Sequence, residues 1–460
     1  MEQTTKRGGF GGKLAAILAA AGSAIGLGNI WRFPYLAAKG GGGLFILVYI
    51  VLALTFGFTL LTTDLAIGRR TGKSSLHAFG EVHKKWRFIG PLTFIVPCII
   101  LTYYCAIGGW VIKYISVYLT GASHAAAGGD YFTSFITSSV SPIVMMLVFL
   151  AITAFVVYNG VEKGVEKFSK IVMPGLIVMI IGICIFSLTL SHDGRNAIDG
   201  LKIYLIPSFE GLTLRKFMTI LLDATGQLFY SLSIAMGIMV TYGSYVDKKE
   251  NLNKSITRIE IFDTGVALLA GLMVIPAVYV FSGTEGLSAN GPGLMFVALP
   301  QIFDKMGIIG IIVGVIFFVM VAFAALTSSV SIMETIVASI MEKTGKTRKQ
   351  VSLFVTIAAA IGAIIICLGY NLFYFEFKLP NGTVGQLLDI ADYASNSLLM
   401  PLVALFTSVL IGWVVKPKWI IEELESSGHK FSKKGLYTIV IKYVVPVVMT
   451  VLFLQALGIL

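Results

Sequence analysis

The chain has 460 residues, of which 56% are hydrophobic and only 13% are charged, and its mean hydropathy is +0.87. A water-soluble globule needs more polar residues to cover its surface, so the composition excludes that class and indicates a polytopic membrane protein in a lipid bilayer. The formal charge of +11 fits either nucleic-acid binding or the basic loops that orient membrane spans, and the positions of the basic residues decide between the two.

Apolar runs that approach the length of a membrane span, about 20 residues, occur eleven times. They predict transmembrane helices over 13–38, 43–67, 88–119, 142–159, 168–190, 217–246, 256–283, 306–341, 349–371, 385–415 and 437–459. The eighth run is too long for a perpendicular span, because it would extend about 54 Å against a hydrocarbon core near 30 Å. We expect this helix to tilt or to project into water.

The basic residues predict the orientation of these helices. With the amino terminus in the cytoplasm, 25 of the 35 Lys and Arg residues fall in inner segments or at the inner ends of spans and 7 in outer loops, while Arg32, Lys113 and Lys442 fall further inside spans. Cytoplasmic loops carry such an excess, so we expect a cytoplasmic amino terminus. The same distribution accounts for the positive charge without nucleic acid.

Four cysteines lie within the apolar runs and form no CxxC pair or cluster with histidine, so we expect neither a disulfide framework nor a metal site made from them. The first twelve residues contain no evident cleavable signal sequence, and we expect the chain to enter the membrane through its first helix. The sequence contains no HExxH motif, nucleophile elbow or phosphate-binding glycine-rich loop, which argues against an enzyme.

Two apolar runs are interrupted in a way that a simple membrane anchor would avoid. The first contains GSAIGLGNIWRFP at residues 22–34, and the sixth contains GQLFYSLSIAMG at residues 226–237. Each glycine inside a helix costs about 1 kcal/mol relative to alanine, and an arginine such as Arg32 costs about 2.5–3.5 kcal/mol at the bilayer centre. We therefore expect both helices to be broken.

Helices 1 and 6 are the first members of two successive sets of five. Breaks at corresponding positions of two halves are typical of transporters built from an inverted repeat, with the binding site at mid-membrane. The sequence predicts a single transporter domain over 1–460, with a first repeat at about 13–190, a second at about 217–415 and an extra helix at about 437–459.

Polar residues near such breaks are candidate ligands, because freed carbonyls can replace water around a cation and half-helix N-termini attract a carboxylate. Asp263 has no basic residue nearby in its own helix, which favours a functional role over an internal salt bridge. Thr327, Ser328 and Ser329 suit a cation that prefers oxygen ligands, although such hydroxyls also bond to carbonyls of their own helix.

Four segments, taken in order, resemble the signature sequences of the neurotransmitter:sodium symporter family. They are GSAIGLGNIWRFPY, GQLFYSLSIAMGIMVTYGSY, GPGLMFVALP at 291–300 and FAALTSSVSIME at 323–334. The resemblance extends through helix 10, over nearly the whole chain. It implies an all-α polytopic membrane protein with the LeuT-like fold, a 5+5 inverted repeat with broken helices 1 and 6, and the eleven-helix prokaryotic type.

The resemblance implies two sodium ions (Na⁺) at the breaks. The groups implied for the first are the substrate carboxylate, the carbonyl of Ala24, and the side chains of Asn29, Ser231 and Asp263. Those implied for the second are the carbonyls of Gly22, Ile25 and Ala324 and the hydroxyls of Thr327 and Ser328. Because the substrate carboxylate is itself a ligand, sodium and substrate would be coupled directly.

The resemblance also implies a substrate site between helices 1, 3, 6 and 8. Its polar contacts would be the amides of Leu27 and Gly28, the hydroxyl of Tyr104, the carbonyls of Ala24, Tyr230 and Ser231, and Ser233. The substrate side chain would contact Ile100, Tyr104, Tyr230, Met236, Ser328 and Ile332, each of which singly also fits core packing. No acid stands where an amine lacking a carboxylate would need one, which favours an amino acid over a monoamine.

Two charge pairs resemble the family's gates. Arg32 is expected to pair with Asp392 in helix 10 above the site. Arg7 is expected to pair with Glu342 at the cytoplasmic side, with Tyr245 close by, and ordinary loop charge is the alternative for this second pair.

Gly164 and Pro174 form a GX9P pattern, which in this family lets helix 5 unwind and admits water to the second sodium site. A proline within a span can also simply kink the helix, so the pattern leaves both roles open.

The chain departs from the family pattern where chloride binds in many animal members. Asp263 stands where many members have asparagine, and Ala267 stands where chloride-dependent members have serine, although Tyr49 and Gln227 match other parts of the chloride site. A built-in carboxylate supplies the negative charge that chloride would bring, so we expect no chloride requirement. Ala235 replaces a glycine of several members and is expected to limit substrate bulk or stiffen the break.

The sequence therefore predicts a sodium-coupled symporter that imports a neutral, hydrophobic L-amino acid by alternating access, as a monomer or weak dimer. A non-transporting amino-acid sensor on the same fold is the alternative, because its binding residues would look alike. The outer loop after helix 3 is short and has neither a cysteine nor a glycosylation sequon, which favours a prokaryotic inner membrane.

Overall fold

The protein is described by a computed structural model that covers residues 13–287 and 291–460. Helices make up almost all of its regular structure. In the described part the strands form two short hairpins, β1 (Ser191–His192) with β2 (Arg195–Asn196) and β3 (Phe377–Lys378) with β4 (Val384–Gly385). The predicted all-α fold class is confirmed.

The first five predicted helices are built from α-helical segments and shorter π-helical segments (η). Helix 1 comprises α1 (Lys13–Ala24), η1 (Gly28–Arg32) and α2 (Phe33–Lys39), and helix 2 comprises α3 (Gly43–Leu52), η2 (Ala53–Gly57) and α4 (Phe58–Thr71). Helix 3 is α6 (Ile89–Leu119), and helix 4 is α9 (Ser141–Tyr158). Helix 5 comprises η4 (Val161–Glu166) and α10 (Lys167–Leu188). The connecting loops carry α5 (Ser75–Val82), the 3-10 turn η3 (Lys84–Trp86), α7 (Ser123–Ala126) and α8 (Tyr131–Ile136).

The remaining helices follow in the predicted order. Helix 6 comprises α12 (Leu214–Ser231) and α13 (Ile238–Gly243), helix 7 is α14 (Leu252–Gly286), helix 8 is α17 (Ile308–Thr344), and helix 9 is α18 (Arg348–Leu368). Helix 10 runs through α19 (Leu387–Asp392), η6 (Tyr393–Leu399), α20 (Met400–Val409) and η7 (Leu410–Val414). Helix 11 runs through α22 (Lys434–Ile439), η8 (Val440–Val444) and α23 (Val445–Ala456). Loop elements are α11 (Ala197–Leu205), α15 (Gly291–Gly293), η5 (Leu294–Ala298), α16 (Leu299–Lys305) and α21 (Lys418–Glu425).

Nine helices in the described part are long and apolar enough to cross a membrane, and the bent pair in helix 1 makes a tenth. These ten match ten of the eleven predicted runs, although helix 5 begins earlier than predicted, at Val161. The predicted sixth span is not among them. Its longer half, α12, carries Arg215, Lys216 and Asp223. The number of eleven spans stays a prediction.

Both predicted breaks are present. In helix 1 the chain leaves α1 after Ala24, and the two halves are bent by 47°. In helix 6 the residues at 232–237 are not helical, and φ is positive at Ser233 (52°), Ala235 (62°) and Gly237 (77°). The second break is narrower than the interrupted segment in the sequence, because its first residues still belong to α12.

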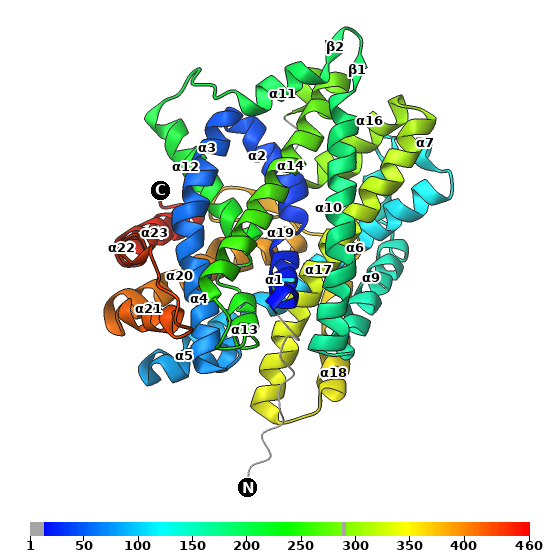
Figure 1. The fold of residues 1–460 in the computed structure, drawn as a ribbon. Coiled ribbons are helices and arrows are strands. Elements are labelled where there is room, and N and C mark those ends of the chain that lie inside the picture. Colours follow the sequence, from blue (N-terminus) through cyan, green and yellow to red (C-terminus); the bar gives the residue numbers. More distant parts are fainter. Residues whose placement is uncertain (1–12, 288–290) are drawn as a thin grey trace.

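The first broken helix lies at the centre of the bundle. α1 packs against α10, α14 and α17, and Figure 1 shows it surrounded by these helices. The loop elements β1–β2, α11 and α16 gather at one end of the bundle, and α5 lies at the other (Figure 1). We call the second the inner end, because the sequence predicts that it is cytoplasmic.

A tight helix crossing holds the inner half of helix 6 in place. A Cβ added to Gly68 of α4 would lie 1.8 Å from the carbonyl oxygen of Val240 in α13. We therefore expect Gly68→Ala to lower the stability of the protein by about 1–3 kcal/mol, because the two helices must move apart. Thermal unfolding of the purified protein in detergent measures this change.

Gly182→Ala is the matched control, since a Cβ at this α10 glycine meets no described atom within 4 Å. It should leave stability unchanged or raise it by up to about 1 kcal/mol through helix propensity. Equal melting temperatures for the Gly68 variant and the parent would contradict the close packing.

Candidate functional site

A buried carboxylate joins the two broken helices. Asp263 of α14 accepts hydrogen bonds on Oδ1 from Asn29 Nδ2 of η1 at 2.8 Å and from Ser231 Oγ at the end of α12 at 2.6 Å. All three residues are buried. The other carboxylate oxygen, Oδ2, is buried and has no hydrogen-bond partner in the described part of the chain. An unpaired buried acceptor is costly, so this oxygen is suited to a cation.

The end of α1 offers further oxygen atoms beside this carboxylate. The chain leaves α1 at Ala24, so the last carbonyls of the helix lack helical partners and carry the negative end of its dipole. Asn29 Oδ1 accepts from the backbone N–H of Gly26 at 3.2 Å, and its second lone pair stays free for an ion. Asp263, Asn29 and Ser231, three of the groups predicted for the first sodium, therefore meet at one place, and Ala24, the fourth, is the last residue of α1.

The groups predicted for the second sodium lie between α1 and α17. Ser328 Oγ donates to the carbonyl of Ser23 at 3.1 Å and approaches that of Ile25 at 3.5 Å. Gly22 faces the same helix, because a Cβ there would lie 3.4 Å from Thr327 Cβ. The oxygen atoms of these residues bridge the broken helix to the long helix 8.

Thr327 also bonds within its own helix. Its Oγ1 donates to the carbonyl of Ala324 at 2.9 Å and to that of Phe323 at 3.1 Å, which is the local bonding that the sequence left open as the alternative. The hydroxyl oxygen keeps its two lone pairs when it donates, so it can also bind an ion.

A small central cavity of about 20 Å³ lies at the helix 1 break. Nine residues predicted to contact substrate line it, namely Ala24, Gly28, Ile100, Tyr104, Tyr230, Ser233, Met236, Ser328 and Ile332. Leu27 and Ser231 do not line it, whereas Ser23, Gly26 and Asn29 do. The cavity has room for about one water molecule, so the side chains around it must move to admit a larger ligand.

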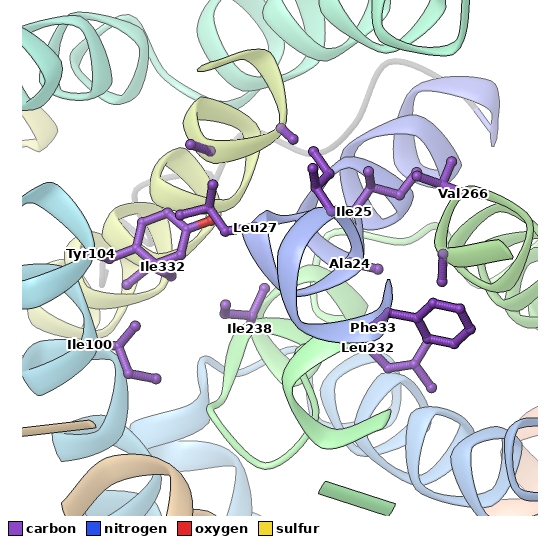
Figure 2. Packing of buried hydrophobic residues seen from close by; sticks show 14 of the residues in the cluster. Ala24, Ile25, Leu27, Phe33, Ile100, Tyr104, Leu232, Ile238, Val266 and Ile332 are labelled. Atoms are coloured by element: carbon purple, nitrogen blue, oxygen red, sulfur yellow. The ribbon is translucent and has the colours of Figure 1, made fainter. Parts of the chain in front are cut away.

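Two tyrosines close this cavity. A Cβ at Gly28 would lie 2.3 Å from Cδ1 of Tyr230, so the Tyr230 ring rests directly on the backbone of the break. The buried hydroxyl of Tyr104 has no hydrogen-bond partner among the described residues. Figure 2 shows the Tyr104 ring extending from α6 toward Leu27, with Ile332 and Ile100 nearby.

A larger cavity of about 900 Å³ lies outside the central site, and we call it the vestibule. Its lining includes Arg32, Tyr103, Tyr230 and Asp392. Within the described residues no ion pair under 4.0 Å joins Arg32 to Asp392, and the Asp392 carboxylate instead accepts from Asn396 Nδ2 at 2.6 Å. The predicted outer gate is therefore not closed by direct contact in this conformation.

The inner end holds the other predicted gate. Arg7 lies outside the described residues. Glu342 accepts hydrogen bonds from the backbone N–H of Ser74 at 2.9 Å and from its hydroxyl at 2.6 Å, and Lys73 Nζ lies 3.4 Å away. These contacts attach the end of helix 8 to the loop after helix 2.

Sequence reasoning missed a second acid at this end. Glu334 is fully buried in α17, where Arg348 pairs with it at 2.5 Å and Tyr245 donates to it at 2.8 Å. The hydroxyl of Tyr245, predicted near Glu342, thus bonds to Glu334, which lies further into the bundle. An acid within an apolar run was the signal that identified Asp263, and the same signal was present at Glu334.

Asp64 of α4 was missed in the same way. It is buried, and its Oδ2 accepts from the backbone N–H of Ala235 at 3.1 Å in the helix 6 break. The freed amide at Ala235 thereby has an acceptor, and the positive φ of this alanine is held in place. The break thus depends on a carboxylate from another helix.

Helix 5 is helical through the GX9P pattern. A Cβ at Gly164 would lie 1.9 Å from the carbonyl oxygen of Val156, so glycine lets η4 approach the end of α9. Pro174 lies inside the continuous helix α10. Close packing thus gives Gly164 a structural role. The unwinding of helix 5 at Gly164 and Pro174 stays a prediction.

Comparison with known proteins identifies the family. The model of the sodium:neurotransmitter symporter family matches residues 7–134 and 132–459. The chain belongs to the sodium:neurotransmitter symporter family. It is a membrane protein and a sodium-coupled symporter, not an enzyme, and its LeuT-like fold is the predicted one.

Relatives of this symporter span essentially its full length. It is 35% identical to the uncharacterized sodium-dependent transporter YhdH of Bacillus subtilis (strain 168), over 97% of each chain. It is 24% identical to the human sodium- and chloride-dependent GABA transporter 2, over 92% of this chain and 75% of that one. A crystal structure of MhsT in complex with L-phenylalanine superposes with a TM-score of 0.85 at 32% identity, covering 98% of this chain and 100% of that one.

The backbone at Ala235 generates a prediction about the helix 6 break. A non-glycine residue at a φ of 62° is strained, and a β-branched residue there is strained further. We expect Ala235→Val to lower the stability of the protein by about 1–3 kcal/mol and Ala235→Gly to leave it nearly unchanged. Thermal unfolding in detergent compares the two variants. Equal losses for both would show that the backbone conformation is not the cause.

Proposed function

We propose that this symporter imports a neutral, hydrophobic L-amino acid together with two sodium ions and without chloride. The observation that carries the proposal is the unpaired Oδ2 of Asp263, buried between the two helix breaks and beside the central cavity. A cation there would offset the buried negative charge and could share the substrate carboxylate as a ligand.

The lining of the central cavity supports a neutral amino acid. Ile100, Met236 and Ile332 supply apolar walls, and no Asp or Glu belongs to the described lining. An amine without a carboxylate would find no acid partner in this cavity. MhsT, which has the same fold, was crystallised with L-phenylalanine. A hydrophobic side chain packed against these walls is consistent with that relative.

The two proposed sodium sites would act differently. The first would link the substrate to Asp263, so substrate and ion would bind together. The second, at Ser328 and the α1 carbonyls, would hold α1 against α17, and its loss would free the two helices to separate. Alternating access would then use the Arg32–Asp392 gate outside, Arg7 with Glu342 inside, and unwinding at Gly164–Pro174. We also propose a prokaryotic inner membrane and a monomer or weak dimer.

Reconstitution in liposomes tests the proposal. We expect uptake of a neutral amino acid from a mixed panel only with an inward sodium gradient. Asp263→Asn should raise the sodium concentration for half-maximal uptake by about tenfold or more, because interactions with a charged group contribute about 1.5–3 kcal/mol and 1.4 kcal/mol is tenfold.

Asp130→Asn is the matched control for this substitution. Asp130 is exposed in a loop and makes no capping hydrogen bond. The sodium dependence of uptake by this variant should therefore equal that of the parent. Uptake that ignores the sodium gradient, or an Asp263→Asn variant with the parent's sodium dependence, would overturn the proposed coupling.

Chloride independence has its own test. The hydroxyl of Tyr49 and Oε1 of Gln227 are buried without partners in the described chain, but the position one turn beyond Asp263 is Ala267, which has no donor. We expect uptake to be the same when chloride is replaced by gluconate on both sides of the membrane. A large loss of uptake in gluconate would show that Asp263 does not substitute for the anion.

A further inference from the structure

The loop between α18 and α19 begins with a run of exposed hydrophobic side chains. Their exposed fractions are 73% for Leu372, 46% for Phe373, 52% for Tyr374, 43% for Phe375 and 51% for Phe377. Burial of one such side chain contributes about 1.5–3 kcal/mol, so leaving five in water is unfavourable. A contiguous apolar patch of this kind marks an interaction surface. We call residues 372–377 the aromatic strip.

The aromatic strip is held at both ends. At its start, Asn371 Nδ2 donates to the carbonyls of Thr137 and Ser138, both at 3.2 Å. At its end the chain enters the β3–β4 hairpin, and Leu379 packs with Tyr393 and Ala456 in a small buried cluster. The apolar side chains are therefore presented by an anchored segment.

The position of the strip indicates what covers it. It follows directly after the outer end of α18, whose Ile357, Ile361 and Ile365 are also exposed, as residues facing lipid would be. The strip thus continues a lipid-facing surface from the span to the membrane–water boundary. Tyr is enriched at this boundary, and Phe and Leu form the apolar faces of helices that lie in it. The carboxylate in the strip, Glu376, accepts a hydrogen bond from Tyr374 at 2.6 Å, which lowers the cost of holding it there.

The hairpin also reaches the vestibule. Pro380, Asn381 and Gly382, which form its tip, belong to the vestibule lining. We propose that the aromatic strip inserts into the interfacial region of the lipid bilayer and thereby anchors the hairpin that forms one wall of the vestibule. The partner is the membrane lipid itself, and this anchoring is independent of which substrate the protein carries.

Tryptophan quenching by brominated lipid tests the proposal. Phe375→Trp and Phe373→Trp add an indole within the strip, and Asn381→Trp adds one at the tip of the following hairpin, in the lining of the vestibule. Each purified variant is reconstituted in vesicles of phosphatidylcholine or of its brominated form. The emission of the parent protein, which has five tryptophans, is subtracted.

We expect the brominated lipid to remove most of the added emission of the two strip variants and little of that of Asn381→Trp. A blue-shifted strip emission that the lipid does not quench, and that changes with the protein-to-lipid ratio, would show that a second copy covers the strip and would overturn the proposal. An unquenched, water-like emission would also overturn it. Thermal unfolding of each variant verifies that it is folded before the comparison.

Discussion

The contact on which the centre of the molecule depends is that of the Asp263 carboxylate with the two helix breaks. One oxygen holds Asn29 beyond the first break and Ser231 before the second, at hydrogen-bond distance. Helices 1, 6 and 7 are thereby joined at one atom. The other oxygen remains without a partner in the described chain, and this asymmetry is what makes the junction suited to an ion.

Backbone exposed at a break must be satisfied by groups from elsewhere in the bundle. In helix 6, Asp64 accepts from the amide of Ala235, and Ser233 Oγ donates to the carbonyl of Ser23 at 3.0 Å. In helix 1, Gln227 Nε2 donates to the carbonyl of Gly28 at 3.0 Å. The two breaks therefore support one another, and a ligand that entered between them would have to displace or share these contacts.

The two ends of the central site differ in how they are closed. Outside the site, the vestibule is open and its two predicted gate charges do not touch. At the inner end, Glu334, Arg348 and Tyr245 form a buried network, and Glu342 is held by Ser74. The structure thus combines a large vestibule on the outer side with a small central cavity and a tightly packed inner end. The proposed alternating access requires such a difference between the two ends.

The sequence by itself determined the class of the protein, the positions of ten spans and the existence of both breaks, because apolar length and glycine-rich polar interruptions are local properties. It also gave the residue types at the ion and substrate sites through motifs that are continuous in the chain. The roles of these residues as ligands stay predictions.

Only the tertiary structure decided which distant groups meet. That Tyr245 bonds to Glu334, that Asp64 supports Ala235, and that Tyr230 rests on Gly28 each depend on how helices far apart in the sequence pack together. The exposure of the aromatic strip is likewise a property of packing, since the same hydrophobic residues could have formed part of a buried core. Helix periodicity indicates which residues share a face of one helix, but the partner of that face is set by the assembled bundle.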